Sequence, residues 1–221
     1  MGDQARILYI EDLPGISEAW CHARMQEIPE FRREKALRLR FHKDRVQSVA
    51  AFCLLCVALG FVPQSFRIAS HGKPFLPDGP EFSLSHSRGC AAAAISRSPV
   101  GVDVETVRTA PMEVCASVFT GNEQELLDSA GDVDRCFFAL WTLKESCVKK
   151  AGVGLSLPLQ NLDVASKSSL WLDGRMCRLT SYGTPLNQMG VCSEMPASFQ
   201  KVKLAELDKL WAEVSQSPSR L

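Results

Sequence analysis

The chain repeats one order of elements twice, a helical segment followed by several short strands, and this order restricts the fold more than any other sequence feature. The first helical segment, 29–59, is one long helix or two abutting helices, and the second runs from 133 to 151. Apolar residues recur at near-helical spacing in the first, and the second is strongly apolar at its start. Because helices and strands must bury their apolar faces against another layer, the sequence predicts an α+β fold with two similar halves.

Short strands are expected after each helical segment, because brief apolar or alternating runs are separated there by Ser, Gly and Pro. Gly60 is expected to end the first helical segment, and Asp173-Gly174 to form a hairpin turn. The expected strands are 66–69, 82–85, 90–96, 100–105, 162–165, 169–172, 175–180 and 188–194. Shorter helices are expected at 112–118 and 122–129, and a frayed tail at 215–221.

Charge and hydropathy exclude several classes of partner. Lys plus Arg and Asp plus Glu both number 25, so no overall basic field favours nucleic acid, and an anionic ligand needs a local cluster of cations. The longest apolar stretch, 49–62, is shorter than the roughly 20 residues of a spanning helix. The first ten residues contain Asp3 and Arg6 and are too short and too charged for a secretory signal. We therefore expect no nucleic-acid partner and no membrane.

The nine cysteines indicate a reducing compartment. Their number is odd, they contain no CxxC pair, and they show no Cys/His grouping typical of a zinc site. Such thiols are most simply small core residues that stay reduced, which is typical of a cytoplasmic protein.

The segment Gly101-Val102-Asp103-Val104-Glu105 places two carboxylates two residues apart at the end of an expected strand. Side chains alternate along a strand, so Asp103 and Glu105 emerge on the same face. Like charges on one face repel unless a cation lies between them. A hard divalent cation fits this position, and a phosphate substrate would complete its oxygen shell. A solvated strand edge, or salt bridges to arginines, would explain the same pair without a metal.

The helix expected at 133–151 contains the run Trp141-Thr142-Leu143-Lys144-Glu145-Ser146-Cys147-Val148-Lys149. Glu145 and Lys149 are four residues apart and share one face of the helix. An ordinary ion pair on the helix surface accounts for this spacing. The alternative is that Glu145 is a third carboxylate, which meets Asp103 and Glu105.

A third motif, Phe82-Ser83-Leu84-Ser85-His86-Ser87, is an expected strand that runs into a histidine flanked by serines. His86 could be a phosphate ligand, a general base or a surface residue. A serine hydrolase is not favoured, because the chain has no G-x-S-x-G nucleophile turn and no second histidine in a convincing setting.

In this order and spacing, the motifs resemble those of the Sfp-type 4′-phosphopantetheinyl transferases, members of the holo-[acyl-carrier-protein] synthase superfamily. The resemblance covers roughly residues 30–195, and its most specific part is the pairing of GVDVE with WTLKES. The matching stretches are Gly72-Lys73-Pro74, 82–86, 101–105, Phe119-Thr120 with Glu123, 141–149, and Gly152-Val153-Gly154-Leu155.

The resemblance implies a magnesium-dependent transfer of the 4′-phosphopantetheine arm of coenzyme A to a serine of an apo acyl or peptidyl carrier protein. Adenosine 3′,5′-bisphosphate is released, and Mn²⁺ is an expected substitute for Mg²⁺. Two α+β subdomains, 1–106 and 107–221, would be related by pseudo-twofold symmetry, with coenzyme A in the cleft between them and a monomer as the working state. The carrier stays open: a fatty-acid acyl carrier, a polyketide or peptide synthetase domain, or a lysine-pathway reductase.

The resemblance also implies roles for individual residues. Asp103, Glu105 and Glu145 would hold the metal, and Glu145, Lys149 and Asp103 would be the catalytic residues. Lys149 would contact the phosphates, His86 would lie near the 3′-phosphate, and Glu145 would take the serine proton, directly or through a water. The coenzyme A site would comprise Lys35, Arg40, Lys43, Arg45, Lys73, Pro74, Ser85, His86, Asp103, Glu145 and Lys149.

Two positions depart from the family pattern. Some bacterial relatives carry a basic residue where Gln47 stands, and the residue after the second acid, Thr106 here, is often charged. Both differences concern contacts with the nucleotide and not the reaction.

Two other functions fit parts of the pattern. A catalytically silent module that binds coenzyme A or a carrier would be expected to lack one acid, yet all three are present. Another metal-dependent phosphoryl enzyme, such as a nuclease, would be expected to have a basic surface beyond one helix.

The segment 107–127 is a candidate docking surface for the carrier. It follows Glu105 directly, and an apolar patch beside an active site suits a transient partner helix. The same side chains could instead belong to the core. They are Met112, Val114, Val118, Phe119 and Leu126.

Overall fold

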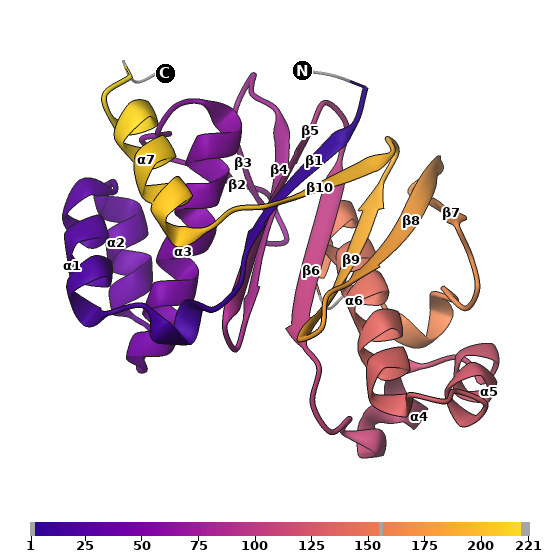
Figure 1. Cartoon of the computed structure of the whole chain (residues 1–221). Coiled ribbons are helices and arrows are strands. Elements are labelled where there is room, and N and C mark those ends of the chain that lie inside the picture. Colours follow the sequence, from indigo (N-terminus) through magenta and orange to yellow (C-terminus); the bar gives the residue numbers. More distant parts are fainter. Residues whose placement is uncertain (1–2, 155–156, 218–221) are drawn as a thin grey trace.

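The computed structural model describes residues 3–154 and 157–217, which form four layers in the order helix, sheet, sheet, helix (Figure 1). The first sheet has the strand order β10 (Ala197–Lys201), β1 (Ala5–Ile10), β5 (Cys90–Ser96) and β4 (Glu81–Ser87). The second has the order β6 (Val100–Thr106), β9 (Asn187–Ser193), β8 (Arg175–Gly183) and β7 (Ser169–Leu172). A small hairpin contains β2 (Arg67–Ile68) and β3 (Pro74–Phe75).

The helices lie on the outer faces of the two sheets (Figure 1). They are α1 (Glu18–Glu27), α2 (Glu30–Leu37), α3 (His42–Leu59), α4 (Cys115–Val118), α5 (Gly121–Asp128), α6 (Val133–Ala151) and α7 (Leu204–Ser215). Short 3₁₀ turns lie at Leu13–Gly15, Met112–Val114 and Leu159–Asn161. In the ranges that the structure describes, no helix combines the length and the hydropathy that crossing a bilayer requires.

Three apolar cores hold the layers together. The first lies between α3 and the first sheet, the second between α6 and the second sheet, and the third between the two sheets. β5 contributes small side chains to both sides: Ala91 and Ala93 face α3, whereas Ala92 and Ala94 face the second sheet. Because successive side chains point to opposite faces, these alanines let both neighbouring layers approach β5 closely.

Each half of the chain gives its last strand to the sheet of the other half. β6 follows β4 and β5 but is hydrogen-bonded to β9, and β10 follows β9 but pairs in parallel with β1. The α+β fold with two similar halves is confirmed, since each half has one long helix on a four-stranded sheet. The division into 1–106 and 107–221 stays a prediction, and both sheets contain strands from either side of it.

The first helical segment is two helices, α2 and α3, separated by residues 38–41. Gly60 ends α3 in the left-handed conformation (φ 77°), as expected. β1, α1, β10 and α7 are additional to the elements expected from the sequence, although α7 is clearly amphipathic. Of the expected tail, Ser215 is the last residue of α7, and 218–221 lie outside the described residues.

The strand expected at 162–165 is wrong. These residues follow a 3₁₀ turn without joining a sheet. Their backbone groups are taken by side chains instead: the Val164 N–H donates to Glu123 Oε1 (2.7 Å), and the Leu162 carbonyl accepts from Lys144 Nζ (2.5 Å). Four residues with three apolar side chains give too little pattern to show whether their backbone groups bond side chains or a neighbouring strand.

Candidate active site

A row of serines joins the two sheets where their edge strands β4 and β6 meet. Alternation along β4 turns Ser83, Ser85 and Ser87 toward β6. Ser83 Oγ accepts a hydrogen bond from the Val102 N–H (3.1 Å), and Ser85 Oγ accepts one from the Val104 N–H (3.3 Å). Serine side chains therefore hold β6 in register with β4 without a backbone ladder between them.

The two acids of β6 are each held by a serine of β4. Ser85 Oγ donates to Asp103 Oδ1 (2.8 Å), and Ser87 Oγ donates to Glu105 Oε2 (2.6 Å). Lys149 Nζ also donates to Asp103 Oδ1 (2.6 Å). The other oxygen of this buried acid, Asp103 Oδ2, has no hydrogen-bond partner among the described residues. One carboxylate oxygen is therefore neutralised by a lysine, while its neighbour is left without a donor.

Arg108 covers Glu105. Its Nη1 donates to Glu105 Oε2 (3.1 Å) and to the Thr106 carbonyl (3.1 Å), and its guanidinium carbon lies 4.6 Å from the centre of the Phe138 ring. Glu105 therefore forms a salt bridge to an arginine. Such a salt bridge is the alternative to a metal that the sequence left open.

Two glycines let α6 lie directly on β6 and β9. A Cβ at Gly101 would lie 1.9 Å from the Ser146 carbonyl oxygen, and a Cβ at Gly190 would lie 2.3 Å from that of Thr142. No side chain fits at either position without moving the helix. This close packing brings Lys149 within reach of the β6 acids.

Glu145 faces the β6 acids, and Lys149 pairs with Asp103 instead of forming the surface ion pair that the spacing alone suggests. Burial raises the pKa of Glu145 most, and Asp103 raises it further. Lys149 lowers this pKa, and Glu105 raises it. A carboxylate whose pKa is raised toward neutrality is a stronger proton acceptor than an ordinary glutamate.

The three carboxylates have the donor chemistry of a hard-cation site, but their side chains do not form a finished one. Within 3–154 and 157–217, no group of three Asp, Glu, His or Cys side chains stands close enough to hold a metal ion. Two observations nevertheless fit a cation: the bare Oδ2 of Asp103, and the repulsion that raises the pKa of Glu145. Asp103, Glu105 and Glu145 are thus the residues that could hold Mg²⁺, and this site stays a prediction.

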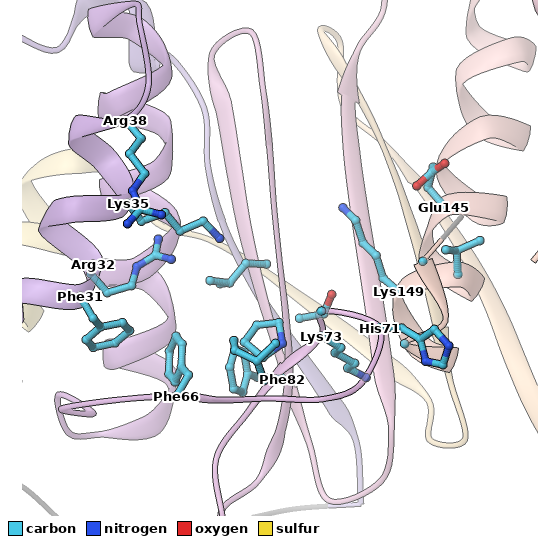
Figure 2. Close-up of a pocket in the computed structure, with 18 of the residues that line it drawn as sticks. Phe31, Arg32, Lys35, Arg38, Phe66, His71, Lys73, Phe82, Glu145 and Lys149 are labelled. Atoms are coloured by element: carbon cyan, nitrogen blue, oxygen red, sulfur yellow. The ribbon is translucent and has the colours of Figure 1, made fainter. Parts of the chain in front are cut away.

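A cavity of about 870 Å³ opens beside these acids. It lies between α2, the β2–β3 hairpin, β4 and the C-terminal part of α6. Figure 2 shows cations on opposite walls, with Arg32 and Lys35 on α2, Arg38 directly after it, and Lys149 on α6. The volume suits a large nucleotide-like ligand, and the opposed cations suit an anionic one.

Three phenylalanines belong to the apolar part of the cavity wall (Figure 2). The ring centres of Phe31 and Phe66 are 5.1 Å apart, and those of Phe66 and Phe82 are 4.8 Å apart. A planar aromatic group of a ligand would find stacking partners here.

Arg32 is a cation without a carboxylate partner among the residues described. It is 5% exposed, its Nη2 donates to the Ser48 carbonyl (3.2 Å), and its guanidinium carbon lies 5.0 Å from the centre of the Phe52 ring. Burial lowers the pKa of the guanidinium, which means that its charge is poorly solvated. A ligand anion in the cavity would stabilise it.

Five of the expected coenzyme A residues line the cavity: Lys35, Lys73, Pro74, Glu145 and Lys149. The amine of Lys73 is already engaged, since it donates to the carbonyls of Lys150 (3.1 Å) and Val100 (3.4 Å). Lys73 therefore also holds the C-terminal end of α6 against the β2–β3 hairpin. Ser85 and Asp103 lie behind Lys149 and not in the cavity wall.

His86 is exposed at the end of β4, outside the cavity wall. Loss of part of the imidazole's water shell lowers its pKa, and the charges of Lys149, Lys35 and Arg32 lower it further, although Asp44 raises it. The pKa of His86 is therefore affected by three cations that line the cavity.

The remaining basic residues lie at the turn between α2 and α3, away from the cavity wall. Arg40 and Lys43 flank the exposed ring of Phe41, at 5.2 Å and 5.7 Å from its centre. Arg45 Nε donates to the Leu39 carbonyl (2.8 Å). The structure does not bring these three together with the acids, and their contact with coenzyme A stays a prediction.

Sequence reasoning missed Arg32, His71 and the aromatic part of the cavity. Arg32 precedes Lys35 by three residues, so helical spacing puts both on one face and was a usable signal. No local pattern predicts that Phe31, Phe66 and Phe82 lie together, because they come from three separate segments: α2, the residue before β2, and β4.

A family model described as the 4′-phosphopantetheinyl transferase superfamily matches residues 99–179, which include β6 and α6. The chain is 30% identical over 153 residues to a 4′-phosphopantetheinyl transferase of Bacillus subtilis, with 65% of this chain and 68% of that protein covered. It is also 30% identical to 4′-phosphopantetheinyl transferase Sfp of Bacillus subtilis (strain 168), with 66% and 70% covered. An L-aminoadipate-semialdehyde dehydrogenase-phosphopantetheinyl transferase of Schizosaccharomyces pombe is 28% identical, with 63% and 66% covered.

The family model and the relatives therefore agree with the resemblance seen in the motifs. The residues that the family model matches include Asp103, Glu105 and Glu145. Because two relatives reach 30% identity with more than two thirds of their length matched, the likeness covers the main body of the protein and not one motif. The chain belongs to the 4′-phosphopantetheinyl transferases.

Proposed function

We propose that this transferase moves the 4′-phosphopantetheine group of coenzyme A to a serine hydroxyl of an apo carrier protein, with Mg²⁺ as its cofactor. The serine oxygen forms a bond to the β-phosphorus of coenzyme A, and the bond from that phosphorus to the bridging oxygen breaks. Adenosine 3′,5′-bisphosphate leaves with the bonding electrons, and the serine proton passes to a base.

One observation carries this proposal: Glu145, whose pKa the β6 acids help to raise, lines a cavity that has cations on two opposite walls. Coenzyme A is a large anion with an aromatic base, and the cavity offers cations and phenylalanines for both parts. A silent binding module would not need a glutamate of raised pKa in the cavity wall beside Lys149.

The chain's own residues divide the work. Lys149 is 30% exposed and would turn from Asp103 to the phosphate oxygens, where it offsets negative charge as the bond breaks. Glu145 would accept the serine proton, because its raised pKa suits a general base. Asp103, Glu105 and Glu145 would hold Mg²⁺, which when bound polarises the phosphates and neutralises part of their charge. Arg108 would have to release Glu105 for it to serve as a ligand.

His86→Ala is expected to weaken coenzyme A more than dephospho-coenzyme A. A charge-assisted contact to the 3′-phosphate contributes roughly 1.5–3 kcal/mol, so the affinity for coenzyme A should fall by about ten- to a hundredfold. Calorimetric titration with both ligands measures the difference, and the ligand without the 3′-phosphate is the matched control. Equal losses for the two ligands would remove His86 from the 3′-phosphate site.

The candidate docking surface is smaller than the sequence suggests. Val118 and Phe119 belong to the core, at 8% and 1% exposure, because α4 turns them toward α6. Met112 is 46% exposed and leaves an apolar side chain on the surface shortly after the β6 acids. The proposed carrier contact therefore centres on the turn at Met112–Val114.

Met112→Asp is expected to raise the KM for the carrier about tenfold and to leave coenzyme A affinity unchanged, because it places a charge in an apolar contact. Steady-state kinetics with varied carrier measures this. Met176→Asp is the matched control, since Met176 is 47% exposed but lies on β8, away from the acids. A similar KM increase in both variants would contradict docking at Met112.

Incubation with coenzyme A, Mg²⁺ and a panel of apo carriers, followed by mass measurement of each carrier, tests the function as a whole. Gain of one phosphopantetheine on any carrier supports it. Binding of coenzyme A without a mass gain on any carrier would favour the silent module. We also propose that the enzyme is cytoplasmic, because the nine cysteines are unpaired, as in reducing compartments. A monomer is proposed as the working state.

A further inference from the structure

A lysine and a glutamate form a fully buried ion pair on the side of α6 that faces away from the β6 acids. Lys144 Nζ lies 2.6 Å from Glu123 Oε2, and both side chains are 0% exposed. Lys144 directly precedes Glu145, and consecutive residues are rotated by about 100° around a helix axis. The two neighbours therefore leave the helix in different directions, one into the core and one into the active site.

Every polar atom of this pair is also hydrogen-bonded to the backbone of another part of the chain. Lys144 Nζ also donates to the carbonyls of Leu159 (2.7 Å) and Leu162 (2.5 Å). Glu123 Oε2 accepts from the Thr120 N–H (2.8 Å) as part of the cap of α5, and Glu123 Oε1 accepts from the Val164 N–H (2.7 Å). The pair thus fastens the start of α5 and residues 159–164 to the middle of α6.

The ion pair contributes less to the stability of the fold than to the relative placement of the segments that it joins. Removing two charges from water costs much of what their attraction returns, so apolar residues of similar size would hold the core about as well. An apolar contact tolerates sliding, whereas this network is satisfied only when α5, α6 and residues 159–164 hold one arrangement. The pair therefore determines where these segments lie relative to Glu145.

Through Glu123, the pair also holds one end of residues 107–120. This segment leaves β6 directly after the acids, and its amide at Ala110 is held by Asp134 Oδ1 on α6 (2.8 Å). It ends at Thr120, which Glu123 holds. In Figure 1, α4 and α5 lie at one end of α6, on the opposite side of the molecule from α2. Neither α5 nor residues 159–164 lines the 870 Å³ cavity.

We propose that Lys144 and Glu123 are positioning residues for the carrier side of the reaction: they hold residues 107–120 at a fixed place relative to Glu145, so that a docked carrier presents its serine to that carboxylate. The inference rests on the proposed function, because it assumes that the carrier contacts this segment. Coenzyme A binding does not depend on the pair.

The test uses the double variant Lys144→Met/Glu123→Gln, which removes both charges but keeps the side-chain lengths and is expected to fold. Its KM for an apo carrier should rise about tenfold, equivalent to about 1.4 kcal/mol, and its kcat should fall. The Kd for coenzyme A should stay within about twofold of the wild type, because neither the pair nor the segments that it holds line the cavity. Lys201→Met is the control, since it removes the Lys201–Glu11 pair (2.6 Å), which joins β10 to the end of β1 far from α5.

Hydrogen exchange gives a readout that needs no activity. Amides of residues 107–128 should exchange faster in the double variant, while those of α3 stay protected. If the double variant folds and keeps both the carrier KM and the protection of 107–128, the pair is no positioning device. An equal loss of coenzyme A affinity would overturn it as well. Failure of the proposed function is a separate result: the wild type would modify no carrier, whatever the exchange pattern shows.

Discussion

Asp103→Ala should abolish phosphopantetheine transfer, with a loss of about a thousandfold or more in kcat/KM. Asp103 holds the amine of Lys149 and offers a buried carboxylate oxygen that has no donor among the described residues. Its removal therefore deprives the phosphates of an ordered lysine and the proposed Mg²⁺ of a ligand. Transfer followed by the mass of the carrier, at ordinary and at raised Mg²⁺, measures the loss.

The same argument predicts that a chelator silences the wild type and that Mn²⁺ restores it, because both ions prefer oxygen ligands. Glu194→Ala is the control for Asp103→Ala: Glu194 also pairs with a basic side chain, Arg175 at 3.2 Å, but it lies outside the cavity wall and outside residues 107–128 and 159–164. Full activity of the wild type in the presence of chelator would overturn the metal site at Asp103.

Glu145→Gln should lower kcat by about a hundred- to a thousandfold, which is the range of general acid–base catalysis. The amide keeps an oxygen for a cation but cannot accept the serine proton. Coenzyme A affinity, measured by titration with Mg²⁺ present, should change little. Single-turnover transfer isolates the chemical step from product release.

The pH dependence gives a second readout for Glu145. The active form is the carboxylate, so the rate should rise with pH through its pKa, which burial and Asp103 raise above that of an ordinary glutamate while no cation is bound. Glu145→Gln should remove that limb. A variant that keeps the limb at a reduced rate would assign the titration to another group, and one that keeps full kcat would exclude Glu145 as the base.

Much of the candidate site follows from local spacing. The alternation of a strand puts Asp103 and Glu105 together, and the turn of a helix puts Glu145 and Lys149 on one face. The serines of β4 also follow a period of two, but their partners on β6 cannot be read from it. Only the packing of two sheet edges turns Ser85 toward an acid instead of toward a nucleotide.

Other features depend on contacts that sequence patterns do not encode. Arg32 becomes a buried cation because Phe52 and Ser48 of the next helix cover it. Arg40 and Lys43 look equivalent to it in the sequence, yet they lie around an exposed ring at the turn. A basic helical segment therefore predicts that an anion site exists nearby, but not which of its cations reach it.

The exchange of β6 and β10 between the sheets couples the two halves of the enzyme during unfolding and refolding. Neither half can melt without removing an edge strand from the sheet of the other, so the halves cannot separate as independent units. Unfolding should be one cooperative transition, in which the cations of α2 and the acids of β6 are lost together. Because β1 pairs with β10 near the other end of the chain, the first sheet is also complete only after almost the whole chain has been made, which favours slow folding.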